Sequence, residues 1–186
     1  MSLVELIAQA DERGLAASGL ACLDRCVPLL GGDDEVLRPL WGTLVEGRDG
    51  DWADRLEQAR GALGGAGSEE PDEDEAALLA RRMLAAAPAG RTAGEVRQWA
   101  DACSVASLQI HRLLDPAEDP GSVDSRREGR TDGMSPLVAA ELRRQITVLE
   151  LLAGHGPAGL RHALEVSTEG RRVLRAVVSR RARGRV

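Results

Sequence analysis

Four residue types are missing from the 186-residue chain, which contains no lysine, asparagine, phenylalanine or tyrosine. Without lysine, the protein can form neither a Schiff base nor the phosphate-binding loop that depends on a lysine. Acid–base catalysis by tyrosine is excluded as well. The Gly-rich stretch 61–68 is therefore interpreted as a helix end followed by a linker. All 24 basic residues are arginine, which indicates a G+C-rich, bacterial type of genome.

Long apolar runs are also absent. The first residues, MSLVELIAQADERG, have no cationic start, and polar residues interrupt their apolar side chains, so they do not resemble a secretory signal. No window approaches the ~20 uncharged apolar residues that a membrane span needs. Three cysteines, an odd number, suit a reducing compartment. The sequence therefore predicts a cytoplasmic protein without a transmembrane segment.

Few residues are available for metal binding or catalysis. Cys22 and Cys26 lie one helical turn apart and Cys103 is distant, so we interpret the cysteines as small buried side chains, with zinc binding or redox sensing as the alternative. The three histidines, in no recognisable ligand spacing, are His111, His155 and His162. Nucleophile-elbow and calcium-loop motifs are absent too. We expect no catalytic residue, no metal and no cofactor.

Charge is distributed unevenly along the chain, whose net charge is −6. Residues 1–75 hold 18 acidic residues against 6 arginines, whereas residues 141–186 hold 4 against 10. Such an asymmetry arises when the two ends of one chain, or two copies of it, attract each other, and it also marks a basic arm for an anionic partner. One hypothesis is therefore a homodimer that places the basic arm of each copy on the acidic face of the other.

Apolar residues spaced by three and four, together with helix caps, predict an all-α bundle of seven to nine helices and no sheet. Ser2 with Glu5 and Thr92 with Glu95 form capping boxes, which open helices that end at Gly14 and near residue 114. The other predicted helices cover residues 15–27, 33–47, 51–63, 76–87, 136–153, 158–166 and 169–182. Residues 154–157 break the chain, and Ser167 or Thr168 is expected to cap the last helix.

We divide the chain into three parts. Residues 1–63 form acidic N-terminal helical hairpins, residues 64–75 a Gly-rich and acidic linker, and residues 76–186 a larger helical part with a basic C-terminal arm. Residues 115–133 are predicted to be a mobile loop, because Ala117 and Val123 are their only non-proline apolar side chains and cannot offset the entropy of ordering.

The segment 96–114, VRQWADACSVASLQIHRLL, allows two interpretations. In the first it is one amphipathic helix, because apolar residues from Val96 and Trp99 to Ile110 recur by threes and fours. In the second it resembles the helix-turn-helix units of bacterial repressors, with Ala100 where a small residue lets the helices touch and Ser104 at the turn. That resemblance implies that the residues facing DNA are Ser107, Gln109, His111 and Arg112.

The C-terminal arm carries further candidate contacts for nucleic acid, namely Arg171, Arg172, Arg175, Arg180 and Arg181. No aromatic residue lies among them, so base stacking is unavailable. A solvated or internally paired arm, or one that contacts a membrane or a protein, is the alternative.

By elimination, the leading hypothesis for function is a non-enzymatic protein-interaction or regulatory adaptor module with a protein partner, which can be a second copy. The alternative is a helix-turn-helix transcriptional regulator that binds DNA through residues 96–114 and the arginine-rich C-terminus. A third hypothesis is a small-molecule sensor with its ligand between the helices of residues 134–182.

Overall fold

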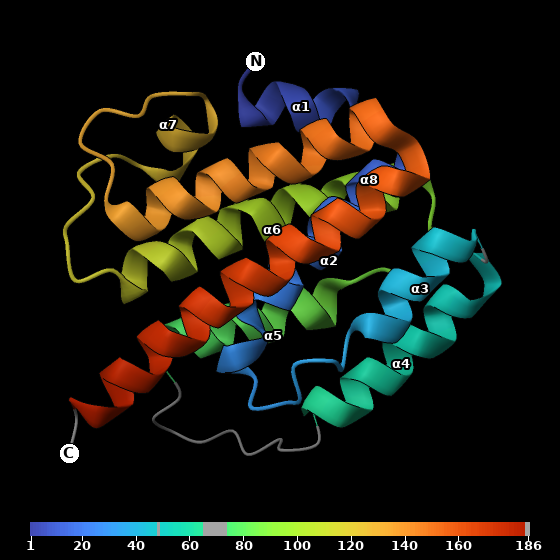
Figure 1. Ribbon diagram of the computed structural model, residues 1–186, viewed down its shortest axis with the longest axis horizontal. Coiled ribbons are helices and arrows are strands. Elements are labelled where there is room, and N and C mark those ends of the chain that lie inside the picture. Colours follow the sequence, from blue (N-terminus) through green and yellow to red (C-terminus); the bar gives the residue numbers. More distant parts are fainter. Residues whose placement is uncertain (48, 65–73, 185–186) are drawn as a thin grey trace.

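The computed structural model describes residues 1–47, 49–64 and 74–184, the side chain of Asp49 excepted. These residues form eight α-helices, one short 3-10 helix and no strand, which confirms the predicted all-α bundle (Figure 1). The elements are α1 (Leu3–Gln9), α2 (Glu12–Cys26), the 3-10 helix η1 (Val27–Leu29), α3 (Arg38–Glu46), α4 (Asp49–Gly64), α5 (Glu75–Ala86), α6 (Ala93–Leu114), α7 (Val123–Arg127) and α8 (Pro136–Arg183).

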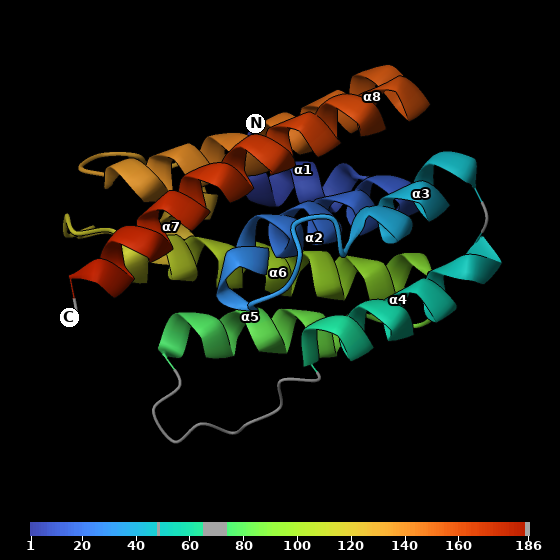
Figure 2. The same ribbon diagram turned by 60° about the horizontal axis from the view of Figure 1, so that its bottom comes forward.

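Helix α2 lies at the centre of the bundle, where it packs against both α6 and α8. Figure 2 shows the layers, with α8 uppermost, α2 below it, then α6, and α5 with α4 at the bottom. Every residue of α2 from Gly14 to Cys26 is buried. Most residues of this stretch are small or apolar on every face of the helix, which is the pattern of a helix that is covered on all sides. Gly19 of α2 lies against the Trp99 ring of α6, where an added Cβ would come within 2.7 Å of ring carbons.

The N-terminal helices begin with a capping box between Ser2 and Glu5, as predicted. The prediction that the first helix continues to Gly14 is wrong, because α1 ends at Gln9. Asp11 then caps α2, and its carboxylate accepts a hydrogen bond of 2.7 Å from the Gly14 backbone N–H. A side-chain cap inside the expected helix therefore divides it in two.

Helix α8 consists of two arms that meet at Gly156, whose φ of 50° and ψ of −132° are not helical. The second arm turns back beside the first (Figure 1), which confirms the break predicted at residues 154–157. The predicted cap at Ser167 or Thr168 is wrong. Both hydroxyls donate hydrogen bonds of 2.9 Å to carbonyl oxygens one turn earlier, and the helix continues through them.

The core joins the acidic N-terminal part to the larger helical part. Buried apolar side chains of both belong to one cluster, within which the rings of Trp52 in α4 and Trp99 in α6 meet edge to face at 6.1 Å. The indole N–H of Trp52 donates to the carbonyl of Pro88 at 2.8 Å. The division into parts stays a prediction, and most of its linker, residues 65–73, lies outside the described residues.

The segment 115–133 contains the short helix α7 and a buried ion pair. Asp119 accepts hydrogen bonds from Arg126 Nε (3.1 Å) and Nη2 (2.6 Å) and from the Ser135 backbone N–H (3.1 Å). Arg126 Nη1 donates to the carbonyls of Arg130 and Asp132. The premise of the predicted mobility, that no contact offsets the entropy of ordering, is therefore wrong, because charged and polar groups provide such contacts without apolar side chains.

No helix in residues 1–47, 49–64 or 74–184 combines the length and the apolar character needed to cross a bilayer.

Candidate functional site

Helix α6 is continuous from Ala93 to Leu114, so the segment 96–114 is a single helix without a turn at Ser104. Its capping box between Thr92 and Glu95 is formed as predicted. The helix-turn-helix alternative is therefore wrong for this segment. The surroundings of Ser104 are also tertiary rather than those of an exposed turn, because Ser104 is buried and donates a 2.7 Å hydrogen bond to Gln145 of α8.

The four residues that the helix-turn-helix resemblance assigned to DNA do not share one surface. Ser107 and His111 are 0% and 1% exposed and lie inside the bundle. Gln109 and Arg112 are half-buried on the outer side of α6, and Arg112 donates a 3.0 Å hydrogen bond to the Asp119 carbonyl. The two buried residues cannot contact a macromolecule.

Three of the five C-terminal arginines pair with acidic residues of the same chain. Arg171 pairs with Asp24, Arg175 with Asp34, and Arg181 with Asp74 at 3.1 Å. The opposite charges of the two chain ends thus meet within one molecule. The charge asymmetry is therefore accounted for within one molecule. It gives no separate support to a homodimer in which the arm of one copy lies on the acidic face of another.

The other two arginines of that set, Arg172 and Arg180, are exposed and form no ion pair with the described residues. They lie eight residues apart on α8, so helical geometry separates them by about 12 Å along the axis. They remain candidate contacts for an anionic partner.

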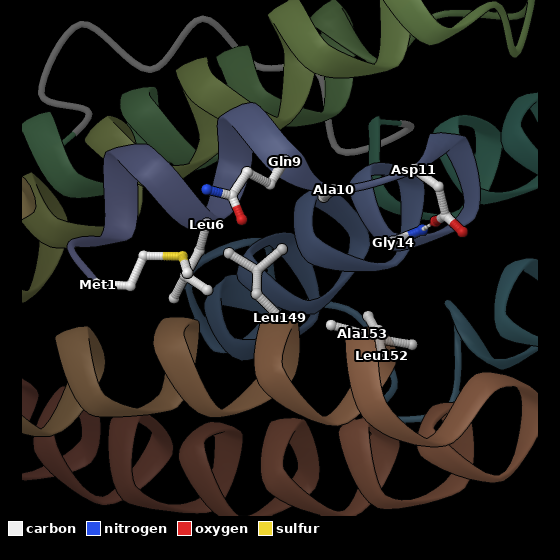
Figure 3. Close-up of a pocket in the computed structure, with 9 residues that line it drawn as sticks. All are labelled: Met1, Leu6, Gln9, Ala10, Asp11, Gly14, Leu149, Leu152 and Ala153. Carbon is white, nitrogen blue, oxygen red and sulfur yellow. Dashed lines mark hydrogen bonds between the residues drawn. The ribbon is translucent and has the colours of Figure 1, made fainter.

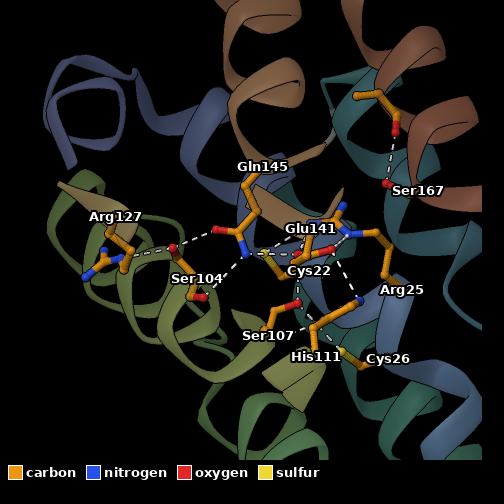
Figure 4. Close-up of polar contacts among 11 residues, drawn as sticks. Cys22, Arg25, Cys26, Ser104, Ser107, His111, Arg127, Glu141, Gln145 and Ser167 are labelled. Atoms are coloured by element: carbon orange, nitrogen blue, oxygen red, sulfur yellow. Dashed lines mark hydrogen bonds and ion pairs between the residues drawn. The ribbon is translucent and has the colours of Figure 1, made fainter. Parts of the chain in front are cut away.

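A buried polar network in the interior is centred on Glu141 of α8 (Figure 4). Arg25 of α2 donates to both oxygens of this carboxylate, from Nε at 2.8 Å and from Nη2 at 2.7 Å, and neither side chain is exposed. The Glu141 oxygen that accepts from Arg25 Nη2 is Oε1, and it also accepts hydrogen bonds from Ser107 Oγ at 2.8 Å and from Gln145 Nε2 at 2.9 Å. The network therefore ties α2, α6 and α8 together.

No spacing or motif in the sequence predicts this network. One feature of the sequence does point toward buried charges. Asp24 and Arg25 are adjacent charged residues inside a stretch of α2 that is otherwise apolar or small. A charge in such a stretch is buried, and a buried charge needs a partner. The partner, Glu141, could not be chosen from the sequence because many carboxylates were equally available.

Burial and charge act in opposite directions on the Glu141 carboxyl. Burial raises its pKa, but the positive charge of Arg25, with smaller contributions from His111 and the hydrogen-bond donors, outweighs burial and lowers the pKa to about 2. Burial lowers the pKa of His111 despite the nearby carboxylate. The ring Nδ1 of His111 lies 2.7 Å from the Ser107 carbonyl oxygen, which can only accept, so Nδ1 carries the proton.

Ser107, His111 and Glu141 are residue types that recur in catalytic triads, but their arrangement is different. The Ser107 hydroxyl donates to the carboxylate and not to the imidazole, and the His111 Nε2 lies 3.6 Å from a Glu141 oxygen. None of the three side chains is reachable from solvent. The geometry fits a role in fixing the register of three helices, which is the best-supported role of buried polar groups.

The three cysteines are free and buried. Burial raises the pKa of Cys22 to about 12 and also raises the pKa of Cys26 and of Cys103. Arg25 Nη2 donates to Cys22 Sγ at 3.5 Å. Within the described part of the chain, no group of three or more His, Cys, Asp or Glu side chains is arranged to hold a metal ion.

The outer side of α5 and α6 carries an apolar groove of about 420 Å³, which we name the α5–α6 groove. Its apolar lining includes Leu79, Met83 and Ala86 of α5 and Ala102, Val105 and Ala106 of α6, and its polar lining residues are Arg82 and Gln109. Leu78, on the adjoining surface of α5, is 37% exposed. No described residue covers the groove.

Two further cavities lie along α8. The one in Figure 3, of about 340 Å³, lies between α1, the start of α2 and the first arm of α8. Its walls include Leu6 and Leu149, and the carboxylate of Asp11 is occupied by the cap of α2. The other, of about 580 Å³, lies between the end of α6 and both ends of α8, beside Leu137 and Val177. The latter is the cavity relevant to the hypothesis of a small-molecule sensor.

No family model matches the chain, and the comparisons with curated proteins and with solved structures give no match either.

Proposed function

We propose that this protein is a non-enzymatic interaction module that binds a helix of a protein partner in the α5–α6 groove. The observation that carries the proposal is the apolar lining of this groove together with the exposed Leu78 beside it. A contiguous exposed apolar surface with polar groups at its margin is characteristic of interaction sites on soluble proteins.

The dimensions and side chains of the groove suit an α-helix. Two helices form its walls, and the small side chains of Ala86, Ala102 and Ala106 permit close approach of a third backbone. Leu79 and Val105 provide larger apolar contacts on either side. A partner helix with apolar residues at positions i, i+3, i+4 and i+7 would bury this lining, which is the helix-in-groove mode of recognition.

Two other charged features of the molecule already have their partners within the chain, which leaves the α5–α6 groove as the better candidate for an interaction surface. The Glu141 network is closed to solvent, and Arg171, Arg175 and Arg181 pair within the chain. The apolar atoms that line the α5–α6 groove are exposed to solvent, and a partner that covers them would gain binding free energy, because burial of apolar surface contributes about 25 cal/mol per Å².

Fluorescence anisotropy of labelled helical peptides tests the proposal. The probe is a synthetic helix of about 18 residues with a leucine–alanine stripe, made with acidic or with basic flanks. We expect binding that Ala102→Arg weakens by about tenfold or more, since the substitution places a long charged side chain in the groove.

The matched control is Ala176→Arg, at an exposed alanine of α8 that does not line the groove. It should leave the affinity unchanged. Absence of binding by both peptides, or equal loss in both variants, would refute the proposal. Labelled duplex DNA belongs in the same assay, since binding at physiological salt that requires Arg172 and Arg180 would favour the nucleic-acid hypothesis instead.

A further inference from the structure

Helix α5 carries two opposite charges on its outer face that find no partner among residues 1–47, 49–64 and 74–184. Glu75 and Arg82 are both exposed, and neither forms an ion pair or hydrogen bond with any described residue. They lie seven residues apart, which is two helical turns, so they share one face but are about 10 Å apart along the axis. They are too far apart to pair with each other.

The residues between these charges are apolar and lie on the same face. Leu78 is 37% exposed and Leu79 lines the α5–α6 groove. At 100° per residue, both leucines project within about 60° of the direction of Glu75 and Arg82. The outer face of α5 thus presents a negative charge, two leucines and a positive charge in order along the helix.

This order is complementary to itself under a twofold rotation. The midpoint between Glu75 and Arg82 falls between Leu78 and Leu79. An axis through that point, with two copies of α5 antiparallel, places Arg82 of each copy opposite Glu75 of the other and the leucines opposite one another. One symmetry operation therefore satisfies both unpaired charges twice, which is the property of an isologous interface.

We propose that the helix that occupies the α5–α6 groove is α5 of a second copy of this chain, an inference that rests on the proposed function of the groove. Each α5 packs between α5 and α6 of the other copy, against Ala102 and Val105, and the four helices form a bundle. The α5–α6 groove adds no charge that would oppose this arrangement, because its other polar lining residue is Gln109.

The expected dimer is reversible. Helix α5 has 12 residues and is therefore about 18 Å long, which gives an interface at the small end of specific protein contacts. We expect a dissociation constant on the order of micromolar, so that monomer and dimer are both observable in an ordinary concentration series.

Sedimentation velocity of the full chain over a concentration series tests the inference. Arg82→Glu and Glu75→Arg each place like charges opposite one another at two points of the symmetric interface, and each should weaken dimerisation by about tenfold or more. The double variant Glu75→Arg with Arg82→Glu restores both pairs in reversed order and should recover dimerisation. Arg172→Glu, at an exposed unpaired arginine of α8, is the matched control and should have no effect.

The outcomes separate this inference from the proposed function. One outcome is a chain that stays monomeric at all concentrations but still binds the helical peptide, with an affinity that Ala102→Arg weakens. This outcome overturns the self-association and leaves a different protein as the partner. A dimer that neither single charge reversal weakens, or that the double variant fails to recover, also overturns it. Circular dichroism of each variant establishes that α5 is intact, and Arg82→Glu tests the pairing without changing the first turn of the helix.

Discussion

Arg25 and Glu141 are 116 positions apart in the chain and form a two-point ion pair in which neither side chain is exposed to solvent. Each charge depends on the other, because an unpaired ion in such an environment costs several kcal/mol. The pair joins the central helix α2 to the first arm of α8, and Ser107 connects it to α6. Helix register in this bundle is therefore coupled to one carboxylate.

Removal of one partner of this pair should destabilise the protein strongly. We expect Arg25→Met or Glu141→Leu alone to lower the free energy of unfolding by about 3–5 kcal/mol, since each leaves a buried charge without its ion partner. The double variant should lose much less than the sum of the two. Urea unfolding followed by circular dichroism measures the cycle, and additive losses would contradict the coupling.

Stability should fall in acid in two stages. The pKa of His111 is lowered from 6.5, so the unfolded chain binds a proton first, and stability decreases as pH falls through about 6.5. The pKa of Glu141 is about 2 against 4.5 for an ordinary carboxyl, so its contribution is complete above pH 4.5 and is lost between 4.5 and about 2. Asp24, whose pKa burial raises, acts in the opposite sense.

Urea midpoints measured from pH 8 to pH 3 reveal both stages. His111→Gln should remove the decrease near pH 6.5 and keep the one below 4.5. A midpoint that does not change between pH 8 and pH 3 would show that neither group is linked to folding.

Gly19 should not tolerate a methyl group. An alanine Cβ at this position would come within 2.7 Å of the Trp99 ring, and we expect Gly19→Ala to cost about 1–3 kcal/mol through overpacking. The control is Gly61→Ala in α4, where a Cβ meets nothing within 4 Å. That substitution should stabilise by about 0.5–1 kcal/mol, because alanine is the better helix former. Thermal unfolding measures both variants. A lower melting temperature for Gly19→Ala and a higher one for Gly61→Ala would support the close contact of α2 and α6.

The bend of α8 should depend on glycine at one position. Gly156 has a φ of 50° and a ψ of −132°, a backbone conformation that a residue with a Cβ adopts only at a cost of about 1–3 kcal/mol. Gly156→Ala should therefore lower the free energy of unfolding by that amount. Gly154→Ala, two residues earlier, has free space for a Cβ and a helical backbone and should be neutral or stabilising. Equal effects of both substitutions would mean that the bend is not set by Gly156.

Local sequence determined the helices and several of their ends. Ser2 with Glu5 and Thr92 with Glu95 form the predicted capping boxes, and the bend at residues 154–157 follows from Gly156 and Pro157. These features depend on contacts within a few residues, so the local sequence is sufficient to predict them. The errors at Gly14 and at Ser167 arose where a local hydrogen bond had two alternatives, a cap or a bond to the preceding turn.

Tertiary structure alone decided which polar residues face solvent and which are buried. Ser107 and His111 occupy an inner face of α6 only because α2 and α8 cover it. Arg171 and Arg175 pair with Asp24 and Asp34, contacts between opposite ends of the chain. The charge asymmetry of the sequence predicted attraction between those ends, but any of many acidic residues could have served. Which charges meet is fixed by the packing of distant helices, because ion pairing has no sequence period of its own.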